Sequence, residues 1–407
     1  MTVRILPGKG LLDVAGFAAQ GVHCGLKRKR RDMCVIVSDR PATAAAVFTQ
    51  NAFAAPPIQV CREHLARGDI RALVCNSGNA NACTGAQGLA DAREMAAHTA
   101  RALDLQPHQV LVASTGIIGR PMRMDLVRAG IDECVTTLKQ ATGGEAAEAI
   151  TTTDTRHKEV LVEAATGGRA FHVAGIAKGA GMIHPNMATM LGFLVTDAPV
   201  AVGPLQAALR RAVDATFNMI TVDGDQSTND MVSVIANGAA GGPPLEPGSP
   251  QLALFEEALT LACRTLARMI ASDGEGATVL LEVRVEGAST REDARAAARA
   301  VASSNLVKAA LHGKDPNWGR VVAALGASSA KVLPERVSIW FEGNDLSVPV
   351  LRGGEPASAG PSADAAEALK AAEVRIRIDL GLGAAVAEAW GCDLTEGYVT
   401  FNSAYTT

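Results

Sequence analysis

The segment Lys178–Leu191, which reads KGAGMIHPNMATML, contains the residues best suited to chemistry. Its glycines and Pro185 exclude a helix or a central strand. It leads into the apolar run Thr189–Thr196, which predicts a buried strand. The simpler interpretation of Thr189 is a β-branched residue that starts this strand.

The alternative interpretation of Thr189 is a self-cleaving N-terminal nucleophile. A strained loop would hold its hydroxyl against the Ala188 carbonyl, so that an N→O acyl shift and hydrolysis could follow. Cleavage would free an α-amino group with a reference pKa of about 7.7–8.0, which is close enough to neutral to act as base for the hydroxyl. The residues alone leave both interpretations open.

Strand and helix patterns alternate on both sides of this segment, as expected of a mixed α/β chain with at least one antiparallel sheet. The predicted strands are Met33–Ser38, Ala45–Thr49, Ile70–Cys75, Val110–Ala113, Glu159–Glu163, Arg169–Ile176 and Val374–Asp379. The predicted helices are Leu89–Leu103, Met124–Gln140, one that starts at Ser249–Pro250 and one after the capping box Ser289–Glu292. The stretch Gly238–Pro250 predicts a loop or boundary.

Composition excludes several classes of protein. The chain has 407 residues, 40 glycines and only 3% aromatic residues, which favours a large core of closely packed layers. A net charge of −4 argues against a nucleic-acid partner. No apolar run is long enough for a membrane helix, and the first residues lack a secretory signal. Eight scattered cysteines are typical of reduced thiols, so we expect a cytoplasmic location.

Motifs for cofactors are missing from the sequence. The eight histidines are dispersed, and no nucleotide-binding or zinc-protease motif occurs, so we expect no metal. The turn Gly381–Val386 imitates a dinucleotide-binding loop. However, Val386 is too large for its position, and too little chain follows for the rest of such a domain.

Nine sequence blocks together resemble the ornithine acetyltransferases, also called glutamate N-acetyltransferases, of arginine biosynthesis. Beside KGAGMIHPNMATML, they are VSDRPATAAAVFT from Val37, NSGNANACTG from Asn76, STGIIG from Ser114, TTDT from Thr152, DGDQSTND from Asp223, DGEGAT from Asp273, GKDPNWGR from Gly313 and the C-terminal YVTFNSAYTT. The blocks extend over nearly the whole chain. The sequence departs from the family at Thr151 and in the tail, where Ser403 and Ala404 follow Asn402.

The resemblance implies a role for specific residues. It implies cleavage between Ala188 and Thr189, with Thr189 as the nucleophile and with Thr115 and Gly116 as the oxyanion hole. The positions that contact substrate would be Thr155, Lys178, Thr189, Glu275, Asn402 and Thr407. Lysine suits an α-carboxylate and glutamate an ammonium group, so this set fits a zwitterionic amino acid.

The resemblance also implies an architecture and a reaction. The fold would be a layered sandwich of mixed and antiparallel sheets between helices, in a main domain of residues 1–278, with a smaller α/β lobe of residues 279–407. A ping-pong reaction would move an acetyl group from N2-acetyl-L-ornithine to L-glutamate in an α₂β₂ assembly. It would need no cofactor, with acetyl-CoA as an alternative donor in bifunctional members.

Two rival functions stay open at this stage. The first is an N-terminal-nucleophile amidase or peptidase, in which water takes the acyl group. The second is a binding protein that keeps the fold without catalysis. Release of free acetate without glutamate would indicate the first, and an uncleaved chain would indicate the second.

Overall fold

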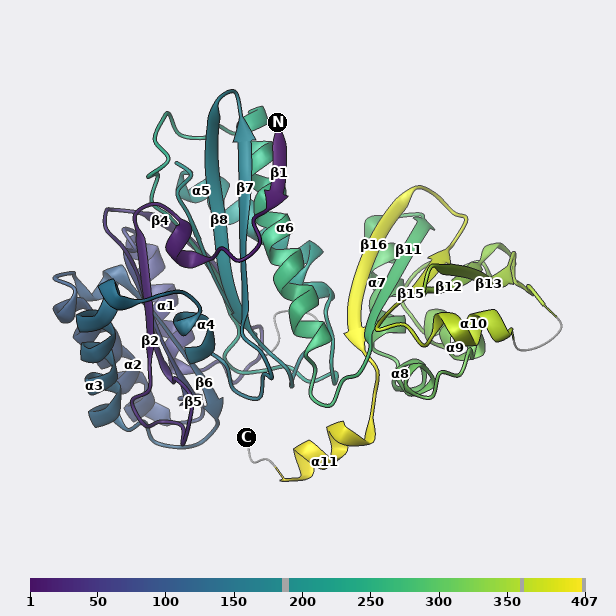
Figure 1. Cartoon of the computed structure of the whole chain (residues 1–407), viewed down its shortest axis with the longest axis horizontal. Coiled ribbons are helices and arrows are strands. Elements are labelled where there is room, and N and C mark those ends of the chain that lie inside the picture. Colours follow the sequence, from purple (N-terminus) through teal and green to yellow (C-terminus); the bar gives the residue numbers. More distant parts are fainter. Residues whose placement is uncertain (185–189, 359–361, 405–407) are drawn as a thin grey trace.

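The structure is a computed structural model that describes residues 1–184, 190–358 and 362–404. Strands of the described residues form three sheets, two of them stacked in the larger part of the molecule and the third in a separate lobe (Figure 1). The expected mixed α/β sandwich with a smaller C-terminal lobe is therefore confirmed.

The six-stranded sheet of the larger part consists of β1 (Thr2–Ile5), β7 (Lys158–Thr166), β8 (Arg169–Lys178), β9 (Leu191–Thr196), β10 (Met231–Ala236) and β4 (Thr43–Phe48), in that spatial order. All its neighbours are antiparallel except β9 and β10, which are parallel. The segment with the candidate nucleophile thus connects β8 to the strand beside it.

The four-stranded sheet consists of β2 (Phe17–Val22), β3 (Met33–Ser38), β5 (Ala72–Asn79) and β6 (Val110–Ile117). Side chains such as Ile36 and Leu73 meet Phe193 and Ile235 of the six-stranded sheet in one buried cluster. Burial of these apolar surfaces holds the two sheets face to face.

Helices cover the outer faces of both sheets (Figure 1). Beside the four-stranded sheet lie α1 (Pro56–Arg67), α2 (Gly85–Ala102) and α3 (Met124–Thr137), whereas the short α4 (Glu145–Ala149) contributes its alanines to the buried cluster between the two sheets. Against the six-stranded sheet lie α5 (Val202–Ala215) and α6 (Pro250–Ser272). Single 3₁₀ turns occur at η1 (Leu11–Asp13), η2 (Pro107–Gln109), η3 (Leu138–Gln140), η4 (Phe217–Met219) and η5 (Pro334–Arg336).

The smaller lobe has a six-stranded sheet with helices on one face. Its strands are β11 (Leu280–Ala288), β12 (Ser338–Gly343), β13 (Leu346–Arg352), β14 (Glu355–Pro356), β15 (Glu373–Asp379) and β16 (Ala385–Cys392). Its helices are α7 (Arg291–Ala302), α8 (Asn305–His312), α9 (Trp318–Gly326) and α10 (Ala363–Ala368), and α11 (Glu396–Ala404) follows outside the lobe. The domain boundary expected at residues 278 and 279 stays a prediction, because one apolar cluster continues from α6 into this lobe.

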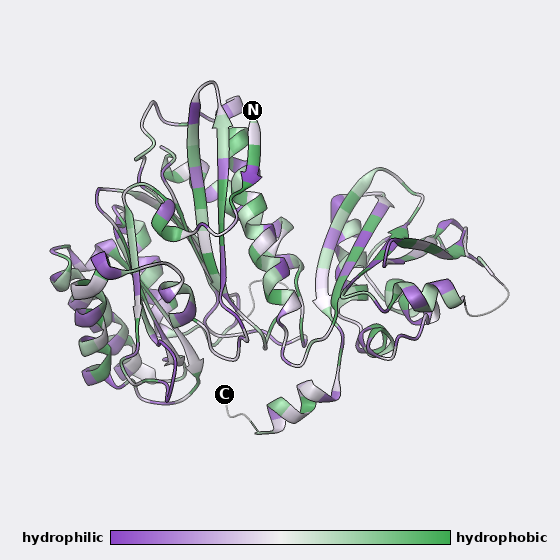
Figure 2. Cartoon of the chain, in the orientation of Figure 1, coloured by the Kyte–Doolittle hydropathy of each residue, from purple (hydrophilic) through white to green (hydrophobic). Residues whose placement is uncertain are grey.

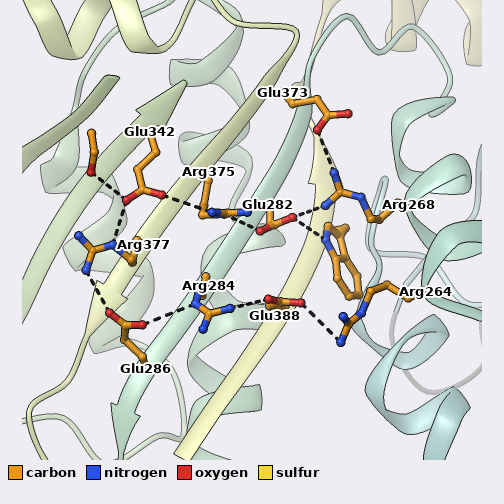
Figure 3. A network of polar contacts seen from close by, with 12 residues as sticks. Arg264, Arg268, Glu282, Arg284, Glu286, Glu342, Glu373, Arg375, Arg377 and Glu388 are labelled. Atoms are coloured by element: carbon orange, nitrogen blue, oxygen red, sulfur yellow. Dashed lines mark hydrogen bonds and ion pairs between the residues drawn. The ribbon is translucent and has the colours of Figure 1, made fainter. Parts of the chain in front are cut away.

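The open face of the smaller lobe's sheet carries a network of ion pairs (Figure 3). Hydrophilic and hydrophobic residues alternate along its strands (Figure 2), so Glu282, Arg284 and Glu286 of β11 share one face. The register places Arg375 of β15 and Trp390 of β16 directly beside Glu282. The charges on this face therefore neutralise one another within the sheet.

Two arginines of α6 extend this network to the larger part of the molecule. Arg268 forms ion pairs with Glu282 and Glu373, and Arg264 lies 3.8 Å from Glu388. These half-exposed pairs each contribute little to stability, but together they fix how α6 lies on the sheet. That matters because α6 leads directly into a loop of the site described below.

Most predicted elements match the structure, and β3 has the expected bounds. Ser249 caps α6 as predicted, since its hydroxyl accepts from the Leu252 N–H. The predicted capping box of α7 is wrong by one residue, because the cap is Thr290, which accepts from the Asp293 N–H. The helix expected over Met124–Gln140 ends at Thr137, and a 3₁₀ turn follows.

The burial of α6 predicts a large loss of stability on truncation. Leu266 of α6 is completely buried, so Leu266→Ala should lower the free energy of unfolding by about 2–5 kcal/mol, measured by urea denaturation. Leu306 of α8 is 58% exposed, and Leu306→Ala should change it by no more than about 0.5 kcal/mol. Equal effects of the two changes would contradict the packing described.

Candidate active site

One cavity brings together residues from both stacked sheets and from the loop that follows α6. Thr115 and Gly116 line it from the end of β6, Lys178 from the end of β8 and Glu275 from that loop. The remaining lining residues are Ala80, Ile118, Thr152, Thr153, Gly181, Met182, Ser227, Thr228 and Asn229. Four predicted site residues, far apart in the sequence, therefore meet around one space.

Gly116 allows two backbones to approach closely at the cavity wall. Its φ is +129°, and a Cβ added there would lie 2.4 Å from the Gly78 carbonyl carbon and 2.6 Å from the Asn79 nitrogen. The pairing of β5 with β6 is irregular at this point. Only glycine fits at this position, because any side chain would clash with the backbone of β5.

Asn229, just before β10 of the six-stranded sheet, forms hydrogen bonds to the end of the four-stranded sheet near Thr115 and Gly116. Its side-chain amide donates to the Ala80 carbonyl at 2.6 Å and to the Ser114 carbonyl at 2.9 Å. The Thr228 hydroxyl donates to its side-chain oxygen at 2.6 Å. Because these groups are buried, the bonds hold the Thr115–Gly116 turn in place relative to β10.

Lys178 presents a buried positive charge to the cavity. The residue is 3% exposed, and no described residue forms a hydrogen bond or ion pair with its ammonium group. Burial lowers the pKa of Lys178, and the carboxylates of Asp154, Asp230 and Glu275 oppose that effect. A buried ammonium group without a direct partner is suited to an anionic ligand such as a carboxylate.

A second buried lysine organises the loops around the cavity. The Lys158 ammonium donates at 2.6 Å to Asp154 and at 2.6 Å to Asp273. Asp154 also accepts from the Gly179 N–H at 2.8 Å, which fixes the turn after Lys178. Burial would raise the pKa of Asp154, but the ammonium groups of Lys158 and Lys178 and this N–H lower it to about 2.

Glu275 lies opposite this cluster and connects to the C-terminal helix. Its N–H donates to the Ala180 carbonyl at 2.9 Å, and its carboxylate accepts from the Asn402 side chain at 2.8 Å. A Cβ at Gly181 would lie 2.5 Å from the Glu275 carboxylate, so the glycine makes room for that group. The α11 helix that carries Asn402 has no buried residue.

Polar contacts attach α11 to the site. The Tyr398 hydroxyl donates to Asp223 at 3.2 Å, and the Thr395 hydroxyl donates to the Gly276 carbonyl at 2.8 Å. Asp223 in turn accepts from the Met182 N–H at 2.6 Å. The C-terminal helix and the glycine-rich loop are thus bound to the same carboxylate.

Thr155 was also predicted to contact substrate. Thr155 is exposed and not part of the cavity wall, and both its hydroxyl and its N–H donate to Asp273. Ala188, Thr189 and Thr407 lie outside the described residues, so their predicted roles stay predictions.

Several polar residues of the cavity were not predicted from the sequence. Thr152, Thr153, Ser227, Thr228 and Asn229 all line it. The blocks TTDT and DGDQSTND contain them, but nothing in their spacing shows that they face β6. Their role depends on the packing of one sheet on the other.

Comparison with known proteins identifies the family. The family model described as ArgJ family matches residues 18–407. The chain belongs to the ArgJ family. The resemblance seen in the sequence blocks is confirmed, and with it the expectation of an enzyme of the acyltransferase class.

Similar proteins of this family match at full length. The chain is 50% identical to the arginine biosynthesis bifunctional protein ArgJ of Symbiobacterium thermophilum. The match extends over 401 residues, which are 98% of each chain. It is 46% identical to the protein of the same name from Bacillus subtilis. That match extends over 393 residues, which are 96% of this chain and 95% of the Bacillus subtilis protein.

Solved structures also match. An ornithine acetyltransferase complexed with ornithine from Mycobacterium tuberculosis is 38% identical with a TM-score of 0.43, covering 45% of this chain and 98% of that chain. A structure of the arginine biosynthesis bifunctional protein ArgJ from Bacillus halodurans is 42% identical, with a TM-score of 0.43. The match covers 46% of this chain and 98% of that chain.

The described ranges contain neither a metal-binding cluster nor a membrane-spanning helix. No group of three histidine, cysteine or acidic side chains there is arranged to hold a metal ion. None of the helices there combines the length and apolar composition needed to cross a lipid bilayer. The eight cysteines are all free thiols.

The close approach at Gly116 predicts a specific effect of a single methyl group. Gly116→Ala should destabilise the protein by about 1–3 kcal/mol more than Gly119→Ala, measured by urea denaturation. Both glycines have positive φ, but nothing lies within 4 Å of a Cβ at Gly119. The control thus isolates the clash from the conformational strain, and equal losses would contradict the close approach.

Proposed function

We propose that this ArgJ-family protein transfers an acetyl group from N2-acetyl-L-ornithine to L-glutamate. The observation that carries the proposal is the convergence of Thr115, Gly116, Lys178 and Glu275 around one cavity. A hydroxyl and a glycine N–H can stabilise an oxyanion, while the two opposite charges can bind a zwitterionic amino acid. The names of the similar proteins support arginine biosynthesis as the pathway.

The nucleophile in this proposal is Thr189, freed by cleavage of the Ala188–Thr189 bond. Lys178 lines the cavity from the end of β8 and lies in register with Leu191 of β9, so residue 189 is only two positions along the chain from the partner of Lys178. Once acetylated, Thr189 would pass the acetyl group to glutamate in a second step. The covalent intermediate divides one difficult amide exchange into two easier reactions.

Each charged residue has a separate task. The Lys178 ammonium binds the α-carboxylate that ornithine and glutamate share. Glu275 binds the ornithine ammonium, and Asn402, which already donates to Glu275, orients it. Thr155 supports Asp273 and thereby Lys158, rather than lining the cavity itself.

The remaining parts of the proposal concern partners and location. The two chains, residues 1–188 and 189–407, stay together and assemble as α₂β₂ in the cytoplasm, and Thr407 at the end of the second chain contacts substrate. The reaction needs no cofactor or metal, and acetyl-CoA is an alternative donor. Use of water instead of glutamate as acceptor would indicate the amidase rival, and it is measured as acetate release without glutamate.

Self-cleavage is tested by intact mass after denaturation. The wild-type protein should give two chains, of residues 1–188 and 189–407, because the hydroxyl attacks the preceding peptide bond. Thr189→Ala should give one chain near 41.9 kDa without transferase activity. Thr189→Ser keeps a hydroxyl and should still cleave. A whole wild-type chain, or normal cleavage of Thr189→Ala, would overturn the proposal.

The role of Lys178 is tested by its charge. A hydrogen bond between charged groups contributes about 1.5–3 kcal/mol, so Lys178→Met should raise KM for both amino-acid substrates by about 10- to 100-fold. Lys29→Met removes an exposed lysine and serves as the control. Since burial lowers the pKa of Lys178, the wild-type KM should begin to rise at a pH below the ordinary lysine range. An unchanged KM in Lys178→Met would contradict this role.

A further inference from the structure

Asp230 is a buried carboxyl group that the proposed reaction does not yet use. It is 1% exposed, immediately before β10, and its Oδ1 accepts from the Met190 N–H at 2.8 Å. Its Oδ2 is also buried and has no hydrogen-bond partner among the described residues. A buried carboxyl oxygen without a partner is costly, so its presence calls for a functional explanation.

The contact with Met190 places Asp230 at the residue that directly follows the proposed nucleophile in the chain. The Met190 nitrogen is covalently bonded to the carbonyl carbon of Thr189. The parallel register continues this contact, because Met231 pairs with Leu191 and the Met231 N–H donates to the Met190 carbonyl at 3.3 Å. The Met190 N–H thus binds the Asp230 side chain, and the Met190 carbonyl binds the N–H of the residue after Asp230. Both contacts are made by the first residue that follows Thr189 in the chain.

The surroundings of Asp230 favour its neutral form. Burial raises the pKa of Asp230 well above its usual range, opposed by the Met190 N–H and the Lys178 ammonium. The flanking strands β4 and β9 contain no titratable side chain. The Cys61 thiol of α1, which contacts Met231, stays neutral because burial raises its pKa to about 12. Lys178 is thus the charged group that acts on Asp230.

We propose that Asp230 exchanges a proton with the backbone nitrogen of Thr189 during cleavage and then binds the amino group that cleavage creates. This inference rests on the proposed function, since it requires Thr189 to be the nucleophile. It gives Oδ2 the partner that it lacks among the described residues. It also explains why a carboxyl group lies at a position where Lys178 is the cation that acts on it among the described residues.

The protons balance as follows. The Thr189 hydroxyl oxygen bonds to the Ala188 carbonyl carbon, and the bond from that carbon to the Thr189 nitrogen breaks. The Asp230 carboxylic acid gives its proton to the departing nitrogen and receives the hydroxyl proton in exchange. After water has hydrolysed the ester, Asp230 passes its proton to the new amine, which leaves a carboxylate–ammonium pair.

Asp230→Asn tests the inference in the full-length protein. The amide oxygen can still accept from the Met190 N–H, but the group can no longer donate an acidic proton. Self-cleavage, followed by intact mass, should slow by about 100-fold or more. In the fraction that matures on long incubation, loss of the carboxylate should lower the pKa of the Thr189 amino group. The acidic limb of kcat/KM should therefore move to lower pH, by about one unit or more.

Ser233→Ala is the matched control. Ser233 lies in β10 and also has a buried oxygen without a partner, but it is three residues further from the cleavage position. This variant should cleave at the wild-type rate with an unshifted pH profile. Asp230→Ser, which is smaller and neutral, is a second test with the same expected results as Asp230→Asn if the amide prevents folding.

The outcome separates this inference from the function on which it rests. If the wild type cleaves, Thr189→Ala does not, and folded Asp230→Asn behaves like the wild type in both rate and pH profile, only the role of Asp230 is wrong. If the wild type stays whole, the proposed function itself fails. A structural role alone would lower the melting temperature of Asp230→Asn without moving the acidic limb.

Discussion

The site depends on one buried ammonium group, that of Lys158. It lies between the carboxylates of Asp154 and Asp273, and each of these carboxylates holds a different loop. Asp154 fixes the turn after Lys178, and Asp273 begins the loop that carries Glu275. A buried ion pair is stable only when its geometry is good and its remaining bonds are satisfied. This arrangement meets that condition, so it sets the spacing of the two charges that face the cavity.

Around this satisfied cluster, a basic group and an acidic group lack direct partners among the described residues, and both border the proposed chemistry. Within that part of the chain, the Lys178 ammonium has no bonded acceptor, and one carboxyl oxygen of Asp230 has no hydrogen-bond partner. Most of the fold obeys local and global rules at once, so such exceptions are expected at functional positions.

Much of the fold could be predicted from the sequence, since short-range patterns decide it. The apolar strand pattern of Met33–Ser38 and the Ser249 cap of α6 both depend on neighbouring residues, and both predictions are confirmed. The site was predicted through family resemblance rather than through spacing. Asn229 could not be found, because its role depends on the packing of one sheet on the other. Thr155 does not line the cavity, and its bond to Asp273 joins residues 118 positions apart, so the sequence could not show this contact. Its contact with substrate stays a prediction.

The strand order of the larger sheet determines when the chain could be cut. Strands β9 and β10, from the second proposed chain, lie between β8 and β4, from the first. Neither piece can form this sheet alone, because each would expose the apolar edges and backbone groups that the other covers. The proposed cut between residues 188 and 189 would therefore follow the formation of this sheet. Maturation of this protein would then report that folding has succeeded, and the two products would be interlocked from the moment they are made.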